Sequence, residues 1–163
     1  MAETIFSRTE LLLGPDALAR LGRCTVAIFG IGGVGSYVAE ALARSGVGSF
    51  VLVDSDVVAV SNINRQILAL HSTVGRPKVD VMRERILDIN PLAKVETRQQ
   101  FLLPGNMAQI LRPDWDYMVD AIDTVSAKIE LAVQAAALGV PLISSMGAGD
   151  KLDPTRVAVA DLF

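Results

Sequence analysis

A glycine-rich segment at residues 30–35, Gly-Ile-Gly-Gly-Val-Gly, constrains this chain more than any other feature. It follows an apolar run at residues 25–29, typical of a buried strand, and it precedes apolar side chains at helical spacing up to Gly46. Gly30 and Gly32 permit a tight turn and the close approach of a ligand, and Gly35 permits close packing of helix on strand. The segment, Gly33 included, therefore predicts a strand–turn–helix unit that binds a phosphate at the helix N-terminus.

The remaining chain alternates strand and helix patterns. We expect strands at residues 50–53, 94–98, 116–121 and 141–145, and helices at 77–89 and 126–138. Such alternation predicts a Rossmann-like α/β fold: an open, mostly parallel sheet with helices on both faces. Alternation in residues 156–160 after a turn-rich stretch predicts an antiparallel C-terminal edge hairpin. Ligands bind such sheets beyond the carboxyl ends of the strands, so the candidate chemistry converges on one edge.

Length and composition indicate one folded domain. The chain has 163 residues, of which 51% are hydrophobic and 20% charged, which suits a globular core. We expect a single domain over 1–163, with an N-terminal helix at 7–21 interrupted at Gly14, a nucleotide-binding core at 24–145 and the hairpin at 146–163. No element follows the last expected strand, which indicates truncation at the C-terminus.

Charge and cysteine usage limit the function classes. The net charge of −3 argues against a domain that traps nucleic acid over its whole surface. The one basic cluster contains Arg76, Lys78, Arg83 and Arg85, of which we interpret Arg83 and Arg85 as a solvated helix face. A single cysteine, Cys24, excludes an internal disulfide and is expected to be buried. With no secretory signal and no long apolar stretch, we expect a cytoplasmic location and no membrane partner.

One acid indicates a nucleotide, and two cations favour a nucleoside triphosphate over a dinucleotide. Asp54 ends the second expected strand, where an acid receives ribose hydroxyls. Arg65 follows it in a polar loop and can reach phosphates beyond the ribose. Lys78 lies in the first turn of a helix, where the dipole disfavours a cation unless the side chain faces an anion. We interpret Arg65 and Lys78 as ligands of the triphosphate.

Two acids at the end of the fourth expected strand are candidates for a metal ligand. A carboxylate from Asp120 or Asp123 can hold Mg²⁺ on the triphosphate, while the other caps the following helix. We assign the metal to Asp123.

Together these motifs resemble the ubiquitin-activating-like (HesA/MoeB/ThiF) superfamily, which includes the molybdopterin and thiamine adenylyltransferases. The resemblance rests on residues 30–35, Asp54 with Asp56, residues 62–66, residues 75–78 and Asp123, and it covers almost the whole chain. It implies that Arg65 and Lys78 grip ATP phosphates, that Asp123 holds Mg²⁺, and that Asn62 and Gln66 line the pocket. It also implies a homodimer in which Arg8 enters the site of the partner subunit.

Within that superfamily, residues 32–37, 39–46, 62–66, 120–123, 147–149 and 153–155 are most similar to the tRNA threonylcarbamoyladenosine dehydratases. The resemblance implies a tRNA substrate and ATP-dependent cyclising dehydration through adenylation of a carboxylate. One alternative is an adenylyltransferase that activates the C-terminus of a ubiquitin-like sulfur carrier, with a sulfur-carrier or sulfur-donor protein as partner. Another is an NAD-binding dehydrogenase or a nucleotide sensor, in which Arg65 and Lys78 would have no role.

Overall fold

The computed structural model describes residues 3–161 and contains one five-stranded parallel sheet. Its strands are β1 (Thr25–Phe29), β2 (Ser49–Val53), β3 (Lys94–Arg98), β4 (Tyr117–Asp120) and β5 (Leu142–Ser144). They lie in the order β3-β2-β1-β4-β5, and every neighbouring pair is parallel. The chain thus builds outward from β1 to β3 and then returns to the other side of β1. This reversal between β1 and β4 is the place where open α/β sheets bind ligands.

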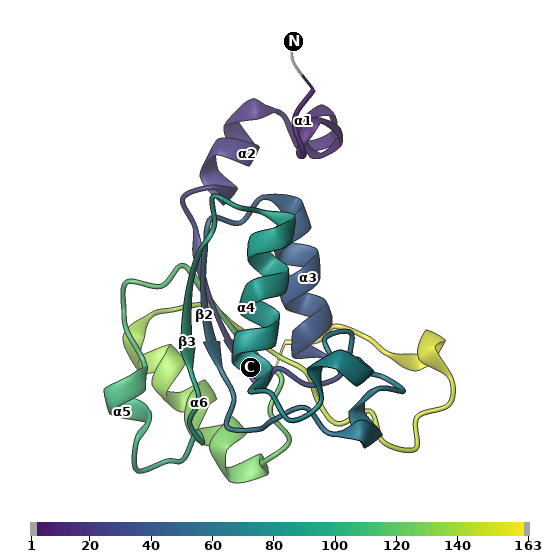
Figure 1. The fold of residues 1–163 in the computed structure, drawn as a ribbon. Helices are drawn as coiled ribbons and strands as arrows, with labels where there is room; N and C mark the ends of the chain where they lie inside the picture. Colours follow the sequence, from purple (N-terminus) through teal and green to yellow (C-terminus); the bar gives the residue numbers. More distant parts are fainter. Residues whose placement is uncertain (1–2, 162–163) are drawn as a thin grey trace.

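Helices cover both faces of the sheet, which confirms the predicted fold class. The longer ones are α3 (Gly35–Ser45), α4 (Lys78–Ile89) and α6 (Val125–Leu138), and α5 (Met107–Ile110) is a single turn. Short 3-10 helices occupy Val60–Asn62, His71–Thr73 and Pro154–Arg156. Figure 1 shows α3 and α4 on one side of the sheet and α5 and α6 on the other. In the described residues no helix is long and apolar enough to cross a membrane.

Two apolar cores form, one on each side of the sheet. Val26 and Ile28 of β1 pack with α3 and α4, whereas Ala27 and Phe29 pack with α5 and α6. A strand that is buried on both faces must be apolar throughout, which explains the continuous run in β1. By contrast, β3 lies at the sheet edge and is largely polar, as its sequence predicts.

The single helix predicted at residues 7–21 is instead two short helices, α1 (Ser7–Leu13) and α2 (Pro15–Leu21). Gly14 separates them with a φ of 83°, and its N–H donates to the Glu10 carbonyl at the end of α1. Pro15 then opens α2 at the position where proline is tolerated. Figure 1 places both helices beyond the end of the sheet where the strands begin. Cys24, expected to be buried, is half-buried there, and its thiol donates to the Arg20 carbonyl.

The predicted antiparallel hairpin at the C-terminus is wrong for the residues that the structure describes. Residues 145–161 contain only the 3-10 helix Pro154–Arg156, and the sheet has no sixth strand among residues 3–161. Val157 and Val159, which suggested the strand, are 75% and 93% exposed. An alternating pattern forms a strand only where a partner strand runs alongside it, and residues 157–160 pair with no strand in the described part of the chain. Residues 162–163 lie outside the described range.

Glu40 joins the two helices that cover one face of the sheet. Its carboxylate lies 2.7 Å from Arg44 on α3 and accepts hydrogen bonds from Arg85 on α4. Arg85, interpreted from sequence as a solvated residue, is therefore paired. The Arg85 guanidinium lowers the pKa of the Glu40 carboxyl below its ordinary value of 4.5, and burial opposes this shift. The ion pair thus stabilises the folded state at every pH at which Glu40 is ionised.

Glu40→Gln is expected to lower the free energy of unfolding by about 2 kcal/mol at pH 7, because charge-assisted hydrogen bonds are lost. A lowered pKa in the folded state contributes stability above the unfolded value and loses it as pH falls. The difference from wild type should therefore persist down to about pH 4.5 and shrink below it. Urea unfolding of both proteins at several pH values measures this difference in the free energy of unfolding. If the difference grew as the pH falls, the ionised Glu40 carboxylate would not be the stabilising group.

Candidate functional site

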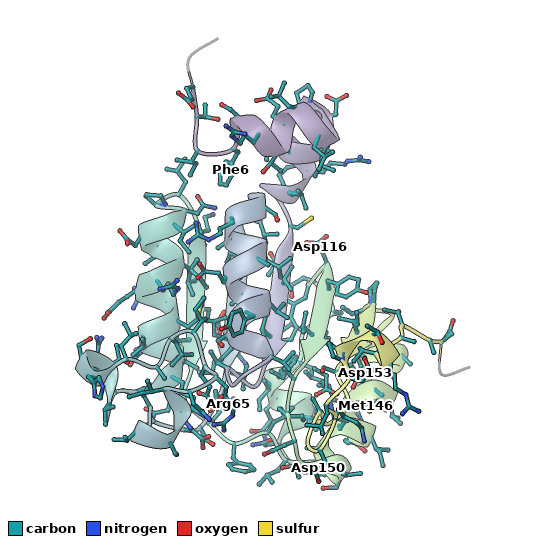
Figure 2. The ribbon with its side chains drawn as sticks, turned by 90° about the vertical axis from the view of Figure 1, so that its right-hand side faces the viewer. Phe6, Arg65, Asp116, Met146, Asp150 and Asp153 are labelled. Carbon is teal, nitrogen blue, oxygen red and sulfur yellow. The ribbon has the colours of Figure 1, made fainter. Side chains whose placement is uncertain are left out.

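A cavity of about 720 Å³ lies at the carboxyl ends of the strands. All five strands contribute to it, because each is followed by a segment that reaches the same edge of the sheet. These segments are the glycine turn after β1, residues 53–56 at the end of β2 and after it, residues 100–102 after β3, residues 121–124 after β4 and residues 145–149 after β5. Asn62, Arg65, Gln66, Lys78 and Ala127 complete the lining. In Figure 2, Arg65 and Met146 lie at this end of the molecule and Asp116, before β4, at the other.

The glycine turn lies against the loop that follows β4. A methyl group at Gly30 would lie 2.6 Å from the Ala121 carbonyl oxygen, and Gly30 also has a φ of 85°. At Gly35 a methyl group would lie 1.8 Å from the Gly30 carbonyl oxygen. Glycine is therefore required at both positions on steric grounds. Gly35 does not line the cavity; it permits α3 to begin directly after Val34, the N-cap residue, which does line it.

Asp54 holds the glycine turn in place. One carboxylate oxygen accepts the Ile31 N–H at 2.6 Å and the other accepts the Asp56 N–H at 2.8 Å. Each carboxylate oxygen has a second lone pair, so Asp54 retains acceptor capacity toward the cavity that it lines. Its position fits the predicted contact with ribose hydroxyls, and it also braces the turn.

Lys78 is buried at the floor of the cavity. Its side chain is 7% exposed and its ammonium lies 2.7 Å from Asp56, whose side chain is 59% exposed. The backbone supports the same placement, since the Lys78 N–H donates to the Asp56 carbonyl and Pro77 pairs with Val57 in an isolated bridge. An ammonium has three donors, and one ion pair to an exposed carboxylate leaves capacity for an anion in the cavity.

Arg65, Asn62 and Gln66 come from one polar loop but differ in role. Arg65 is exposed and donates to the Ser61 carbonyl and Asn64, with its aliphatic part 3.8 Å from a methyl group placed at Gly33. Asn62 is buried, and its side chain accepts the Ala59 N–H, which closes the 3-10 turn. The Gln66 side-chain oxygen is buried without a partner. A buried unpaired acceptor in a cavity wall fits a ligand that brings its own donor.

The two acids after β4 have separate environments. Asp120 is fully buried and paired with Lys128, whereas Asp123 is exposed and lines the cavity. Within residues 3–161 no three acidic, histidine or cysteine side chains are grouped to hold a metal. Mg²⁺ is commonly held by one or two carboxylates together with substrate phosphates, so Asp123 alone fits that mode of binding. The preference for Asp123 over Asp120 agrees with this geometry.

Nearly all the sequence-predicted residues meet in this cavity. Its walls include Gly30, Gly32, Gly33, Asp54, Asp56, Asn62, Arg65, Gln66, Lys78 and Asp123. Arg8 does not line it, because α1 lies at the opposite end of the sheet. The sequence analysis did not identify Gln100, Phe101 and Leu102 as cavity residues. They follow β3 closely, and segments at the carboxyl ends of parallel strands are expected at the ligand site.

Comparisons with known proteins give a consistent result. The model of the ThiF family matches residues 6–160. A tRNA threonylcarbamoyladenosine dehydratase from Bacillus subtilis is 51% identical over 96% of this chain and 62% of its own length. The crystal structure of the Escherichia coli tRNA N6-threonylcarbamoyladenosine dehydratase in complex with ATP has a TM-score of 0.93 and 44% identity, and the match covers 96% of this chain and 64% of that one.

A more distant relative carries another activity. A sulfur carrier protein adenylyltransferase from Thermus thermophilus is 39% identical over 80% of this chain and 48% of its own length. The chain thus spans about half to two thirds of the length of these relatives.

The glycine turn provides a matched pair of variants. Gly35→Ala should lower the free energy of unfolding by about 3 kcal/mol or more, because its methyl group has no space beside the Gly30 carbonyl. Gly33→Ala should stay within about 0.5 kcal/mol of wild type, since its methyl group meets nothing closer than 3.8 Å. Urea unfolding of both variants checks the pair, and equal stabilities would refute the described packing.

Proposed function

Because the chain belongs to the ThiF family, we propose that it is an ATP-dependent enzyme that adenylates a carboxylate. The observation that carries this proposal is that Lys78 and Arg65 line one cavity with the glycine turn, including Val34, the N-cap of α3. Two cations beside a helix N-terminus suit a chain of phosphates. We propose that residues 1–163 form one adenylation domain, with ATP as substrate and Asp54, Asp56, Asn62 and Gln66 at the nucleotide.

The proposed chemistry makes a poor electrophile reactive. A carboxylate is a poor electrophile because hydroxide is a poor leaving group. In the proposed reaction one carboxylate oxygen attacks the α-phosphorus of ATP and pyrophosphate leaves. The carboxylate is then joined to AMP, which is a better leaving group. The attacking carboxylate is already ionised, so this step requires no general base. Arg65 and Lys78 stabilise the charge that builds up on the departing pyrophosphate, and they are already oriented before the reaction. Asp123 is the residue that would hold Mg²⁺, and the ion would add positive charge at the phosphate oxygens.

We propose threonylcarbamoyladenosine in tRNA as the substrate. The support is the similarity to two proteins named as tRNA threonylcarbamoyladenosine dehydratases, at 51% and 44% identity. After adenylation an internal atom of the side chain attacks the activated carbonyl carbon and AMP leaves. The ring closes with net loss of water. A cytoplasmic location fits a tRNA substrate.

The alternative is adenylation of the C-terminus of a sulfur-carrier protein. The Thermus thermophilus relative favours it, because the same adenylation step serves either carboxylate. The two proposals share the site and differ only in the acceptor.

The deciding experiment incubates the protein with Mg-ATP and tRNA from cells that lack the dehydratase, then analyses the nucleosides by mass spectrometry. Loss of one water from threonylcarbamoyladenosine, only with ATP, is the expected result. An unchanged nucleoside, with ATP–pyrophosphate exchange on addition of a sulfur-carrier protein, would establish the alternative. Binding of NADH without ATP-dependent chemistry would overturn both proposals.

Lys78→Ala should slow adenylation by roughly a hundredfold, as expected when an oriented charge at the transition state is removed. Arg83→Ala is the control, because Arg83 is an exposed residue on the same helix and does not line the cavity. The rate of ATP–pyrophosphate exchange measures both. Near-normal exchange in Lys78→Ala would remove Lys78 from the proposed mechanism.

Arg8 provides a test of the homodimer, which we propose to be the active form with Arg8 acting in the partner's site. If Arg8 completes the site in trans, Arg8→Ala and Lys78→Ala should each be strongly impaired alone. Mixed dimers would contain one intact site, so activity should reappear when the two variants are mixed. No recovery despite subunit exchange, followed by native mass spectrometry, would show that Arg8 does not act in trans.

A further inference from the structure

A buried ion pair lies directly behind the cavity wall and does not line the cavity. Lys128 on α6 places its ammonium 2.7 Å from the Asp120 carboxylate at the end of β4. The side chain of Lys128 is 13% exposed and that of Asp120 is fully buried. Sequence reasoning assigned no role to Lys128, and Asp120 was only the less favoured metal ligand.

All three ammonium donors of Lys128 are used within the protein. Lys128 donates to Asp120, to the Ser144 hydroxyl at 3.2 Å and to the Ser145 carbonyl at 2.9 Å, which uses all three ammonium donors. The Ser144 hydroxyl donates to the same Asp120 oxygen, while the other oxygen accepts the Ile122 N–H. Lys128 therefore has no donor left for a ligand, and any effect it has on catalysis acts through other residues.

The first segment that the pair controls is the loop containing Asp123. Asp120 and Lys128 are eight residues apart, and their ion pair closes this loop at its base. On the other side the Ala121 N–H donates to the Phe29 carbonyl, beside the glycine turn. Asp123 thus projects from a short loop whose two ends are fixed.

The second segment is the opposite cavity wall at residues 145–149. The Ser145 carbonyl accepts from Lys128, and the Ser145 N–H donates to the Asp120 carbonyl at 2.8 Å. Both walls therefore begin at the same cluster of Asp120, Lys128 and Ser144. Met146 and Asp150, which follow, lie together at this end of the molecule in Figure 2.

Stability alone does not account for such a cluster. Replacing a buried ion pair by apolar residues is often neutral or stabilising, because the attraction only offsets the cost of removing both charges from water. One Lys128 donor meets the Ser145 carbonyl of the cavity wall, and the other two meet Asp120 and Ser144, which directly precede the two wall segments. The cluster is therefore placed to hold the base of the loop that carries Asp123.

We propose that Lys128 is a positioning residue that sets the placement of Asp123 and of residues 145–149, and so tunes metal-dependent binding of the nucleotide. The inference rests on the proposed function, since it presumes that ATP and Mg²⁺ bind in this cavity. It assigns Lys128 no contact with either. Residues that support a metal ligand in this way typically change metal affinity by ten- to a hundredfold when they are replaced.

The test compares Lys128→Met with Lys128→Arg and with a control, Arg85→Met, which disrupts the Glu40 ion pair on the other face. ATP affinity is measured by calorimetry over a range of Mg²⁺ concentrations. Lys128→Met should raise the Mg²⁺ concentration for half-maximal binding about tenfold, with metal-free ATP binding unchanged. Lys128→Arg should recover part of the loss, and Arg85→Met should lower stability alone.

Two further measurements separate positioning from a general loss of structure. The Ile122 amide, which donates to Asp120, should exchange with deuterium faster in Lys128→Met than in Arg85→Met. In an Asp123→Asn background, Lys128→Met should have no additional effect on the Mg²⁺ dependence, because the two residues act as one unit. If Lys128→Met does not fold, Asp120→Asn, which keeps the side-chain volume, takes its place in both measurements.

An unchanged Mg²⁺ dependence in the folded variant would overturn the inference, as would equal weakening of ATP binding with and without Mg²⁺. A wild-type protein that binds no ATP would instead overturn the proposed function. In that case the Ile122 exchange rate still decides whether Lys128 fixes the loop.

Discussion

The contact between the glycine turn and the loop after β4 is the constraint on which the site depends. The backbones at Gly30 and Ala121 approach so closely that no side-chain atom fits between them. β1 and β4 are neighbours at the point where the strand order reverses, so this contact joins the two halves of the sheet. Val34, the N-cap of α3, and the loop with Asp123 consequently line the same cavity.

Two lysines, Lys78 lining that cavity and Lys128 behind its wall, show how pairing separates ligand binding from structural support. Lys78 pairs with an exposed carboxylate, so a ligand phosphate can compete for its ammonium. Lys128 pairs with a fully buried carboxylate and two further oxygens, so its ammonium has no donor left for a ligand. A lysine can therefore bind a ligand or support the structure, depending on whether its partner carboxylate is exposed or buried.

The parts of this arrangement that depend on local sequence were predictable. The glycine turn follows from spacing and steric limits, and Lys78 is conspicuous because a cation in a first helical turn opposes the dipole. The role of Lys128 was not predictable, because its partners Asp120 and Ser144 come from two other strands and a lysine on a helix is usually solvated. The absent hairpin has a similar cause: residues 157–160 have the pattern of a strand, but a pattern does not supply a neighbour. Phe101 belongs to no motif and reaches the cavity only through the position of β3.

The division of β1 between two cores restricts how this sequence can change during evolution. Val26 and Ile28 belong to one core and Ala27 and Phe29 to the other. Insertion or deletion of one residue within β1 would exchange the two sets and send each side chain into a space shaped for a different volume. It would also rotate the glycine turn away from Ala121. Related sequences should therefore differ in β1 by substitution only, whereas changes in length should collect in exposed connections such as residues 103–106.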